Sequence, residues 1–157
     1  MITKKIVKLP FKMKEHYLPG KNKIFYKKNV FKKRKTLVFI HGLSGSSSAW
    51  IPYEKKFEKK YNILSIDLRG HGKSFRPEGY ENYSIHHFSQ DIYDVLHHEK
   101  ISNCIMISHS FGSIILIEFL KNHKELVSSA ILISATHLPS KRLISKIIKP
   151  LYYLGKI

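Results

Sequence analysis

Residues 101–120, which read ISNCIMISHSFGSIILIEFL, decide the fold. A short apolar run at 104–107 ends abruptly in SHSFG at 108–112, and a second apolar run of helical character follows at once. This order predicts a strand, a sharp turn and a helix. At such a turn Ser110 is lifted out of both elements, so we expect its hydroxyl to point into open space above the carboxyl end of the strand. The small residues Ser108 and Gly112, two positions before and after it, let the strand and the helix pack closely.

The length and composition indicate one globular domain. With 157 residues and 43% hydrophobic residues the chain can bury a core, although enzymes with an open α/β sheet commonly exceed about 200 residues. The single cysteine, Cys104, cannot form an internal disulfide, which suits a reducing compartment. The start lacks an apolar block of signal-peptide length and no stretch approaches the length of a membrane span. We therefore expect a soluble, cytoplasmic protein.

The net charge of +17 is distributed unevenly. Residues 1–35 carry 13 Lys and Arg with one acid, and residues 138–157 carry 5 with none, whereas residues 36–137 hold 10 of each sign. The basic run at 32–35 is most simply a solvated loop, with an anionic partner as the alternative. Because the segment with the candidate chemistry is electrically balanced, nucleic-acid binding is not expected to be the main function.

Strand and helix patterns alternate along the chain. Two lysine-rich strands, at about 4–9 or 12–18 and at 23–29, flank the turn signal PGKN at 19–22 and suit an exposed antiparallel edge. Each later strand is separated from the next by a helix, which forces parallel pairing and right-handed crossovers. The sequence thus predicts an α/β fold with a doubly wound, mostly parallel sheet. Its expected strands lie at 36–40, 61–66, 104–107 and 127–135, and its expected helices at 50–60, 84–98 and 111–120.

Three loop segments follow these strands and resemble one family when taken together. They are HGLSGSSSAW at 41–50, DLRGHGKS at 67–74 and SHSFG at 108–112. Their order and spacing resemble the HG turn, the D-x-R-G-x-G-x-S segment and the G-x-S-x-G nucleophile elbow of the α/β-hydrolases. Ser108 departs from the last motif, because the family has glycine there. The resemblance covers about residues 21–137, which we interpret as the N-terminal part of an α/β-hydrolase core.

The resemblance implies a serine hydrolase that acts on an ester, thioester or amide of a small molecule. Ser110 is the implied nucleophile, and the backbone N–H groups of Leu43 and Phe111 are the implied oxyanion donors. Asp67 and Arg69 are expected to fasten the second loop. The family's dehalogenases and epoxide hydrolases carry an aspartate at the elbow, so Ser110 speaks against those activities. No cofactor and no metal are implied.

The base and acid of the family's triad are missing. In the family they follow the nucleophile in the order Asp or Glu, then His, on loops after later strands. After Ser110 the sequence contains the acids Glu118 and Glu125 and the histidines His123 and His137. Only His137 follows a strand at the carboxyl edge, so it is the one local candidate for a substitute base. We therefore interpret the chain as a C-terminally incomplete hydrolase, truncated or split.

The helix expected at 84–98 contains four histidines. They occur in the pairs at 86–87 and 97–98, with Asp91 and Asp94 between them. His87 and Asp91, like Asp94 and His98, are four residues apart and share a helix face. This pattern permits a metal site, but a solvated face with surface ion pairs explains it as well.

The strand expected at 127–135 and the segment that follows it leave alternatives open. Residues 138–157 have an apolar stripe opposed by lysine and arginine, which is typical of an amphipathic basic helix. It resembles the start of the family's cap, and a membrane-surface helix has the same pattern. The strand before it is apolar, with nothing in this chain to pair with its outer side, so we expect a partner or a missing segment there. A non-catalytic binding module with this fold is the alternative function.

Overall fold

The computed structural model describes residues 13–135 and Lys149. His137 and the helix expected at 138–157, apart from Lys149, lie outside the described residues. The elements in chain order are β1 (Lys14–Tyr17), β2 (Phe25–Lys28), β3 (Thr36–Ile40), η1 (Ser47–Trp50), α1 (Ile51–Phe57), β4 (Asn62–Ile66), η2 (Tyr80–Tyr83), α2 (Ile85–His98), β5 (Cys104–His109), α3 (Phe111–His123), η3 (Lys124–Leu126) and β6 (Val127–Ile133).

The strands form a single sheet in the order β1-β2-β4-β3-β5-β6. β4, β3, β5 and β6 run parallel to one another, whereas β1 pairs antiparallel with β2 and β2 pairs antiparallel with β4. The predicted α/β fold with a mostly parallel, doubly wound sheet is confirmed. Because β3 lies between β4 and β5, the loops that leave these three strands meet at one edge of the sheet.

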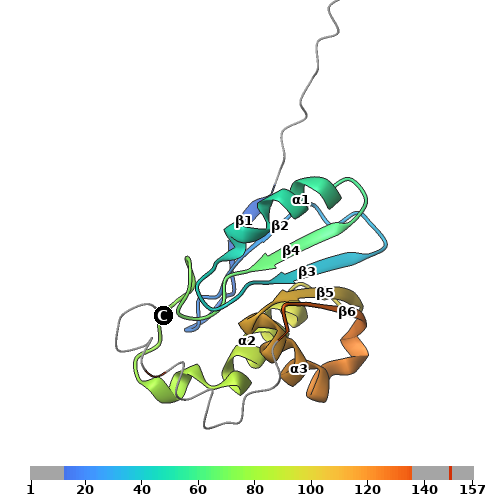
Figure 1. Cartoon of the computed structure of the whole chain (residues 1–157). Coiled ribbons are helices and arrows are strands. Elements are labelled where there is room, and N and C mark those ends of the chain that lie inside the picture. Colours follow the sequence, from blue (N-terminus) through green and yellow to red (C-terminus); the bar gives the residue numbers. More distant parts are fainter. Residues whose placement is uncertain (1–12, 136–148, 150–157) are drawn as a thin grey trace, which may run out of the picture.

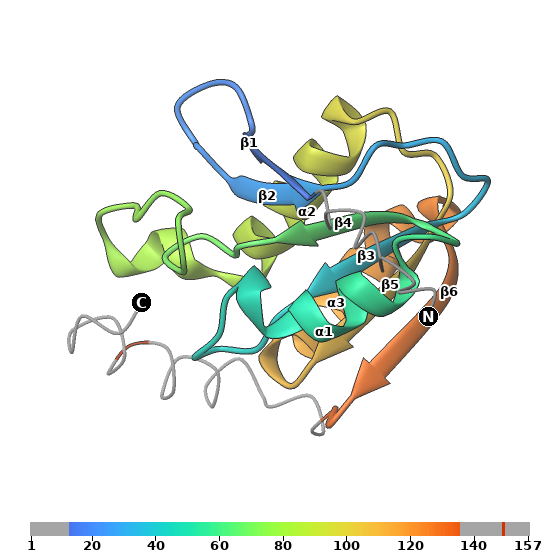
Figure 2. The ribbon, with the colours of Figure 1, turned by 90° about the horizontal axis from the view of Figure 1, so that it is seen from above.

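Helices cover both faces of the sheet. α1 packs on one face, and α2 and α3 lie side by side on the other (Figures 1 and 2). The larger apolar core lies under α2 and α3, where Phe88, Ile92 and Phe119 are fully buried. The smaller core lies under α1 around Phe39 and Trp50. Burial on both faces explains why β3 is apolar throughout.

The N-terminal hairpin differs in part from the exposed edge that the lysine pattern predicted. β1 is the edge strand and is largely exposed, as expected. β2, however, lies between β1 and β4, and Phe25 and Tyr26 are buried. The prediction of an exposed β2 is therefore wrong: β4 would otherwise be an open edge, and β2 closes it while burying two aromatic rings.

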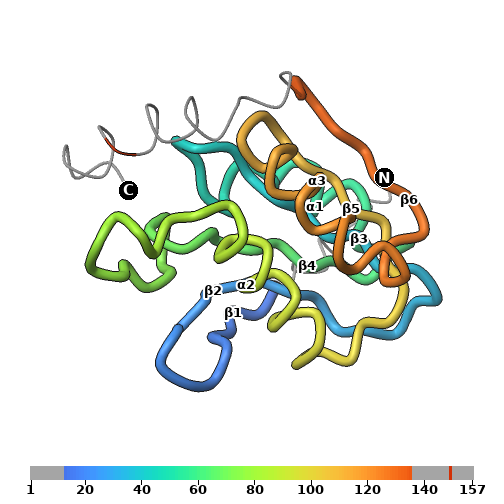
Figure 3. Tube along the Cα trace, turned by 90° about the horizontal axis from the view of Figure 1, so that it is seen from below, coloured from blue at the N-terminus to red at the C-terminus, as the bar shows by residue number. Residues whose placement is uncertain are grey.

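β6 forms the opposite edge and pairs only with β5 in the described part of the chain (Figure 3). Its residues are exposed after Val127. The exposed side-chain fractions of Ile131, Leu132 and Ile133 are 50%, 37% and 37%. The strand predicted at 127–135 thus exists, and it presents the open apolar edge that its sequence led us to expect.

Candidate active site

Ser110 is the residue at which β5 ends and α3 begins. Its backbone adopts φ 51° and ψ −115°, a left-handed conformation that costs a residue with a side chain roughly 1–3 kcal/mol. The surroundings hold it there. Its N–H donates to the carbonyl oxygen of Ile133 at 2.9 Å, and its own carbonyl oxygen accepts from the N–H of Ser113 at 2.8 Å. Ser110 therefore belongs to neither regular element, and its side chain is half-buried.

Ser108 and Gly112, the small residues on either side of Ser110, allow the close packing of strand and helix that the sequence predicted. A Cβ atom added to Gly112 would lie 2.6 Å from the carbonyl oxygen of His41 and 2.9 Å from that of Ile40. Only glycine allows α3 to begin directly against the end of β3. Ser108 is fully buried, and its hydroxyl finds a partner in the Ser113 hydroxyl at 3.1 Å. The structure therefore accommodates serine in place of the first glycine.

The turn after β3 lies directly against Ser110. A Cβ atom on Gly42 would be 3.5 Å from the Cβ of Ser110 and 3.1 Å from Nδ1 of His109. The N–H of Leu43 donates no hydrogen bond within the described residues, and neither does the N–H of Phe111, the first residue of α3. Two unpartnered main-chain donors thus flank the serine, one from the turn and one from the helix end.

His41 holds that turn from the protein interior. Nδ1–H of His41 donates to the carbonyl oxygen of Gly42 at 2.7 Å, and its Nε2 accepts from the N–H of Leu68 at 3.0 Å. Burial of the ring lowers the pKa of His41 to about 4. A neutral imidazole with a defined tautomer therefore connects the loop after β3 to the loop after β4.

The loop after β4 is fastened by its own polar residues. The carboxylate of Asp67 accepts from the N–H of Ser47 at 2.6 Å and from the N–H of Lys73 at 2.8 Å. The guanidinium of Arg69 donates two hydrogen bonds to Asp91, at 2.6 and 2.7 Å. Asp67 and Arg69 thus stabilise the conformation of this loop, as the sequence indicated.

His71 from the same loop reaches the turn beside Ser110. Its Nε2 faces the carbonyl oxygen of Leu43, and its Nδ1 faces that of Arg69 at 2.9 Å. Both oxygens only accept, so a ring with a single proton donates to one of them. The side chain is almost fully buried, with its ring 5.2 Å from that of His41. The sequence gave no signal for this contact.

Comparison with known proteins agrees with this geometry. The sequence profile of the family described as alpha/beta hydrolase fold matches residues 35–153, which is most of the chain. This chain belongs to the α/β-hydrolase family. The matched region includes Ser110 and the turn at 41–46, which we call the HG turn after its first two residues, His41 and Gly42.

The curated relatives include proteins named as an esterase/lipase and as epoxide hydrolases. A Haemophilus influenzae protein provisionally named an esterase/lipase is 36% identical over 103 residues, which are 66% of this chain and 35% of that protein. Epoxide hydrolase 3 of Xenopus tropicalis is 27% identical over 106 residues, which are 68% of this chain and 29% of that protein. The chain thus spans about a third of the length of these relatives.

Solved structures show the same fold at lower sequence identity. A thioesterase domain from the curacin biosynthetic pathway superposes with a TM-score of 0.77 at 22% identity, over 92% of this chain and 54% of that domain. A CIB-like hydrolase from Thermoplasma acidophilum superposes with a TM-score of 0.72 at 20% identity, over 87% of this chain and 70% of the other.

Among the described residues, the side chains of His41, His71 and His123 are each engaged elsewhere and are not free to act as a base for Ser110. Both nitrogens of His41 and of His71 face main-chain groups of the two loops. His123 lies at the far end of α3, stacked on Tyr93 with ring centroids 4.2 Å apart. His109 is exposed, with Nδ1 next to Gly42. His137, the candidate for a substitute base, lies outside the described residues.

The acids after Ser110 lie away from the serine as well. Glu118 is on α3 and bonds Lys121 at 2.8 Å, and Glu125 is in η3 after the helix. α3 begins at the serine and carries the chain away from it, so Glu118 lies about two helical turns from the serine and Glu125 lies beyond the end of the helix. Neither acid is positioned to orient a base at the carboxyl edge.

The histidine-rich helix α2 is not the uniformly solvated face suggested by its pattern. Asp91 is buried and engaged by Arg69, so the expectation of a solvated Asp91 is wrong. The side chain of Asp94 accepts from Gln90 at 2.8 Å. Among the described residues, no group of three His, Cys, Asp or Glu side chains is arranged to hold a metal ion. Nor is any helix in that part long and apolar enough to cross a bilayer.

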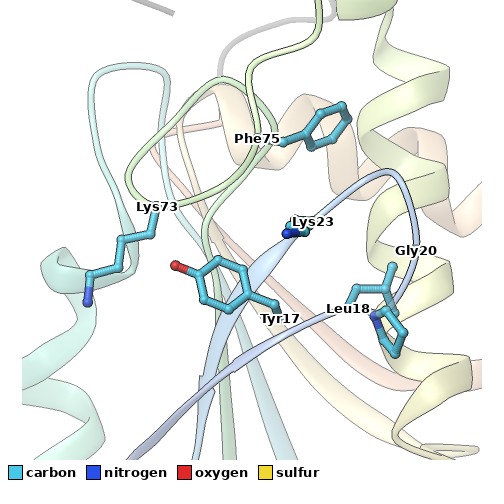
Figure 4. Close-up of a pocket in the computed structure, with 7 residues that line it drawn as sticks. Tyr17, Leu18, Gly20, Lys23, Lys73 and Phe75 are labelled. Atoms are coloured by element: carbon cyan, nitrogen blue, oxygen red, sulfur yellow. The ribbon is translucent and has the colours of Figure 1, made fainter.

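A cavity lies at the same edge of the sheet but away from the serine (Figure 4). Its volume is about 570 Å³, and it is formed by the β1–β2 turn and the loop after β4. Tyr17 and Phe75 supply aromatic walls, and Lys23 and Lys73 also line the cavity, although the ammonium group of Lys73 is paired with Glu15. Neither Ser110 nor the HG turn lines this cavity, so it is separate from the candidate active site.

Proposed function

We propose that this chain carries the nucleophilic half of a serine hydrolase that cleaves an ester, thioester or amide of a small molecule. The observation that carries the proposal is the position of Ser110 at the turn between β5 and α3, beside two N–H groups that find no partner among residues 13–135. Such a turn stores conformational strain that a purely structural serine would not require. Preformed donors beside a hydroxyl are the arrangement that acyl transfer uses.

The chemistry proceeds in two steps. Oγ of Ser110 attacks the carbonyl carbon while its proton passes to a base, and the carbonyl oxygen becomes an oxyanion held by the N–H groups of Leu43 and Phe111. Collapse of this intermediate expels the alcohol, thiol or amine, which takes the proton from the base. Water then attacks the acyl-serine by the same route and releases the carboxylic acid. Loss of one oxyanion donor typically costs about 3–4 kcal/mol of transition-state stabilisation.

The proposed base comes from His137 or from a polypeptide that adds to the open edge of β6. The edge supports the second source, since an exposed apolar strand favours pairing with another strand. It is also close to the serine, because the carbonyl oxygen of Ile133 accepts the hydrogen bond of the Ser110 N–H. A strand that pairs with β6 would therefore end near the nucleophile.

The serine favours ester-type substrates over epoxides. Relatives of this chain are named both esterase/lipase and epoxide hydrolase. The epoxide hydrolases of the family use an aspartate at the elbow, because the carboxylate opens the epoxide directly. A hydroxyl nucleophile is suited instead to a carbonyl carbon whose oxygen can enter the oxyanion donors.

A fluorophosphonate probe tests the proposal on the full chain. We expect the probe to label Ser110, and Ser110→Ala to abolish the labelling. Ser48→Ala is the matched control, because Ser48 is an exposed serine in η1, outside the turn at 41–46, and should leave the labelling intact. Labelling that persists in Ser110→Ala would refute the nucleophile assignment, and a folded chain without any labelling would show that no base in this chain, His137 included, activates Ser110.

A second candidate function is a binding module with the same fold but no catalysis. The exposed apolar side chains of Ile131, Leu132 and Ile133 favour it, because they suit the addition of a partner strand. The same probe separates the two candidates: a folded chain that pairs through β6 yet never reacts at Ser110 is the module.

Residues 138–157 are proposed as the start of a cap, with weak contact to a membrane surface as the alternative. The basic charge of this segment supports either role. Co-sedimentation with anionic liposomes, for the chain with and without these residues, distinguishes them. Equal binding by both forms would remove the membrane role.

A further inference from the structure

Two buried histidines contact the carbonyl oxygens of Gly42 and Leu43, which belong to the peptide groups before and after the Cα atom of Leu43. The oxygen of Gly42 accepts from His41 at 2.7 Å and from the N–H of Gly45 at 3.0 Å. The oxygen of Leu43 is bonded to Nε2 of His71. The two peptide planes that meet at the Cα of Leu43 are therefore each fixed by a side chain.

The first of these planes determines where the oxyanion donor points. In a trans peptide the C=O and N–H groups lie on opposite sides of the plane, and none of the described peptide bonds is cis. Because the oxygen of Gly42 is drawn toward the buried ring of His41, the N–H of Leu43 in the same plane points the other way. In that direction the N–H meets no acceptor in the described part of the chain, and the turn that carries it lies against Ser110.

The second peptide plane, which contains the carbonyl oxygen of Leu43, restricts the remaining rotation of the Leu43 N–H group. Leu43 could still turn its N–H away by rotating about its own φ and ψ, which would also displace its carbonyl oxygen. The bond from His71 opposes this displacement. His71 is itself held, since its loop is fixed by the paired Arg69 and Asp91 and by the carboxylate of Asp67.

We propose that His71 is a positioning residue for the oxyanion donor at Leu43, acting through a proton on Nε2 that it donates to the carbonyl oxygen of Leu43. This inference rests on the proposed hydrolase function. A carbonyl oxygen only accepts hydrogen bonds, so the contact requires hydrogen on Nε2 whether or not Nδ1 also carries one. The identity of residue 71 thereby sets the direction of a donor on a different loop.

Two substitutions separate this role from a general structural one. In His71→Gln the side-chain amide can place its N–H where Nε2 was, whereas in His71→Asn the shorter amide reaches only the position of Nδ1. Both variants lose the imidazole ring and its packing, so they share the structural cost. Only the glutamine variant retains a donor for the carbonyl oxygen of Leu43.

The first measurement is the rate at which a fluorophosphonate labels Ser110. We expect His71→Asn to label about 10-fold to 100-fold more slowly than the unmutated chain, because small displacements of a catalytic donor are costly. His71→Gln should recover most of the rate. Equal rates in the two variants, with both folded, would overturn the positioning role.

The second measurement does not depend on reactivity. Backbone ¹³C′ and ¹⁵N shifts of residues 42–44 report the orientation of the two peptide planes. They should move in His71→Asn and return toward their original values in His71→Gln. Unchanged shifts in His71→Asn refute the inference even if Ser110 reacts. Shifts that move as expected in a chain that never reacts refute the proposed function and leave the positioning of Leu43 intact.

A third measurement needs no variant and covers the case in which both substitutions prevent folding. The ¹⁵N shifts of the His71 imidazole in the unmutated chain reveal whether Nε2 carries a proton. A protonated Nε2 supports the inference, and an unprotonated Nε2 overturns it.

Discussion

The buried ring of His41 should make the stability of this protein depend on pH. Its pKa falls from 6.5 to about 4 in the folded chain because burial disfavours the charged form. In the unfolded chain the ring is solvated and titrates near its ordinary pKa of about 6.5. Between these two values the unfolded state binds a proton that the folded state does not. Stability is therefore lost as the pH falls through 6.5, and the loss levels off below about 4.

The size of the effect follows from the difference between the two pKa values. Each pKa unit corresponds to about 1.4 kcal/mol, so the full loss from this one ring is about 3 kcal/mol. Between pH 7 and pH 5 the loss is about 2 kcal/mol, because only part of the titration has then taken place. Such a loss is a large fraction of the stability of an ordinary domain, which is about 5–15 kcal/mol.

Urea unfolding at pH 7 and pH 5 measures this loss. Trp50, the only tryptophan of the chain, is buried under α1, and its fluorescence reports unfolding. The comparison variant is His41→Asn, whose side-chain amide can still donate to the carbonyl oxygen of Gly42 but does not titrate. We expect this variant to be less stable at pH 7, because the N–H of Leu68 loses its acceptor.

The decisive quantity is the difference in pH dependence between the two proteins. Other titrating groups, such as Asp91, whose pKa is raised by burial, and Glu99, whose pKa is lowered chiefly by Lys28 against an opposing effect of burial, are present in both. The unmutated chain should therefore lose about 2 kcal/mol more than His41→Asn between pH 7 and pH 5. Equal losses would show that His41 is not held neutral by burial, and the account of the HG turn would fail with it.

Three further substitutions test the packing of the site and the sheet edge. Gly112→Ala should destabilise the fold by about 1–3 kcal/mol in urea unfolding, because its Cβ would press on backbone oxygens at the end of β3; an unchanged midpoint would contradict this close contact. Asp91→Asn should cost about 3–5 kcal/mol by leaving the buried charge of Arg69 without its partner, and a loss below 1 kcal/mol would show the pair to be unimportant. Ile131→Lys should reduce self-association in sedimentation velocity, because a charge on the edge strand opposes pairing. Val30→Lys is the control, since Val30 is similarly exposed at 53% but lies outside the strand; equal effects would exclude β6 as the associating edge.

The fold could be predicted because its signals are local. The apolar run before Ser110, the glycine after it and the alternation of strands with helices each act over a few residues. The N-cap of α2 is of the same kind: Ser84 accepts from the N–H of His87 at 3.3 Å, at the position where the sequence placed the helix start. These features depend on backbone conformation near the residue itself and need no knowledge of the rest of the chain.

The contacts that the sequence did not reveal all connect distant loops. The bond from Nε2 of His71 to Leu43 and that from the N–H of Leu68 to His41 cross between the loops after β3 and β4. No spacing in the sequence relates these residues, because they meet only through the strand order β4-β3-β5. The buried pair of Arg69 and Asp91 was missed because it joins the loop after β4 to helix α2, where the sequence pattern suggested a solvated face.

The open edge and the candidate nucleophile are physically coupled. The N–H of Ser110 is held by the carbonyl oxygen of Ile133, the last residue of β6, and Ser108 contacts the same strand through Ile131. A strand paired on one side opens more readily than one paired on both, because fewer hydrogen bonds and less buried surface oppose its separation. Each opening of β6 releases the Ser110 N–H and with it one restraint on the strained hinge. A polypeptide that adds to β6 would thus do two things at once: it would cover the apolar side chains and it would hold the serine in its left-handed conformation.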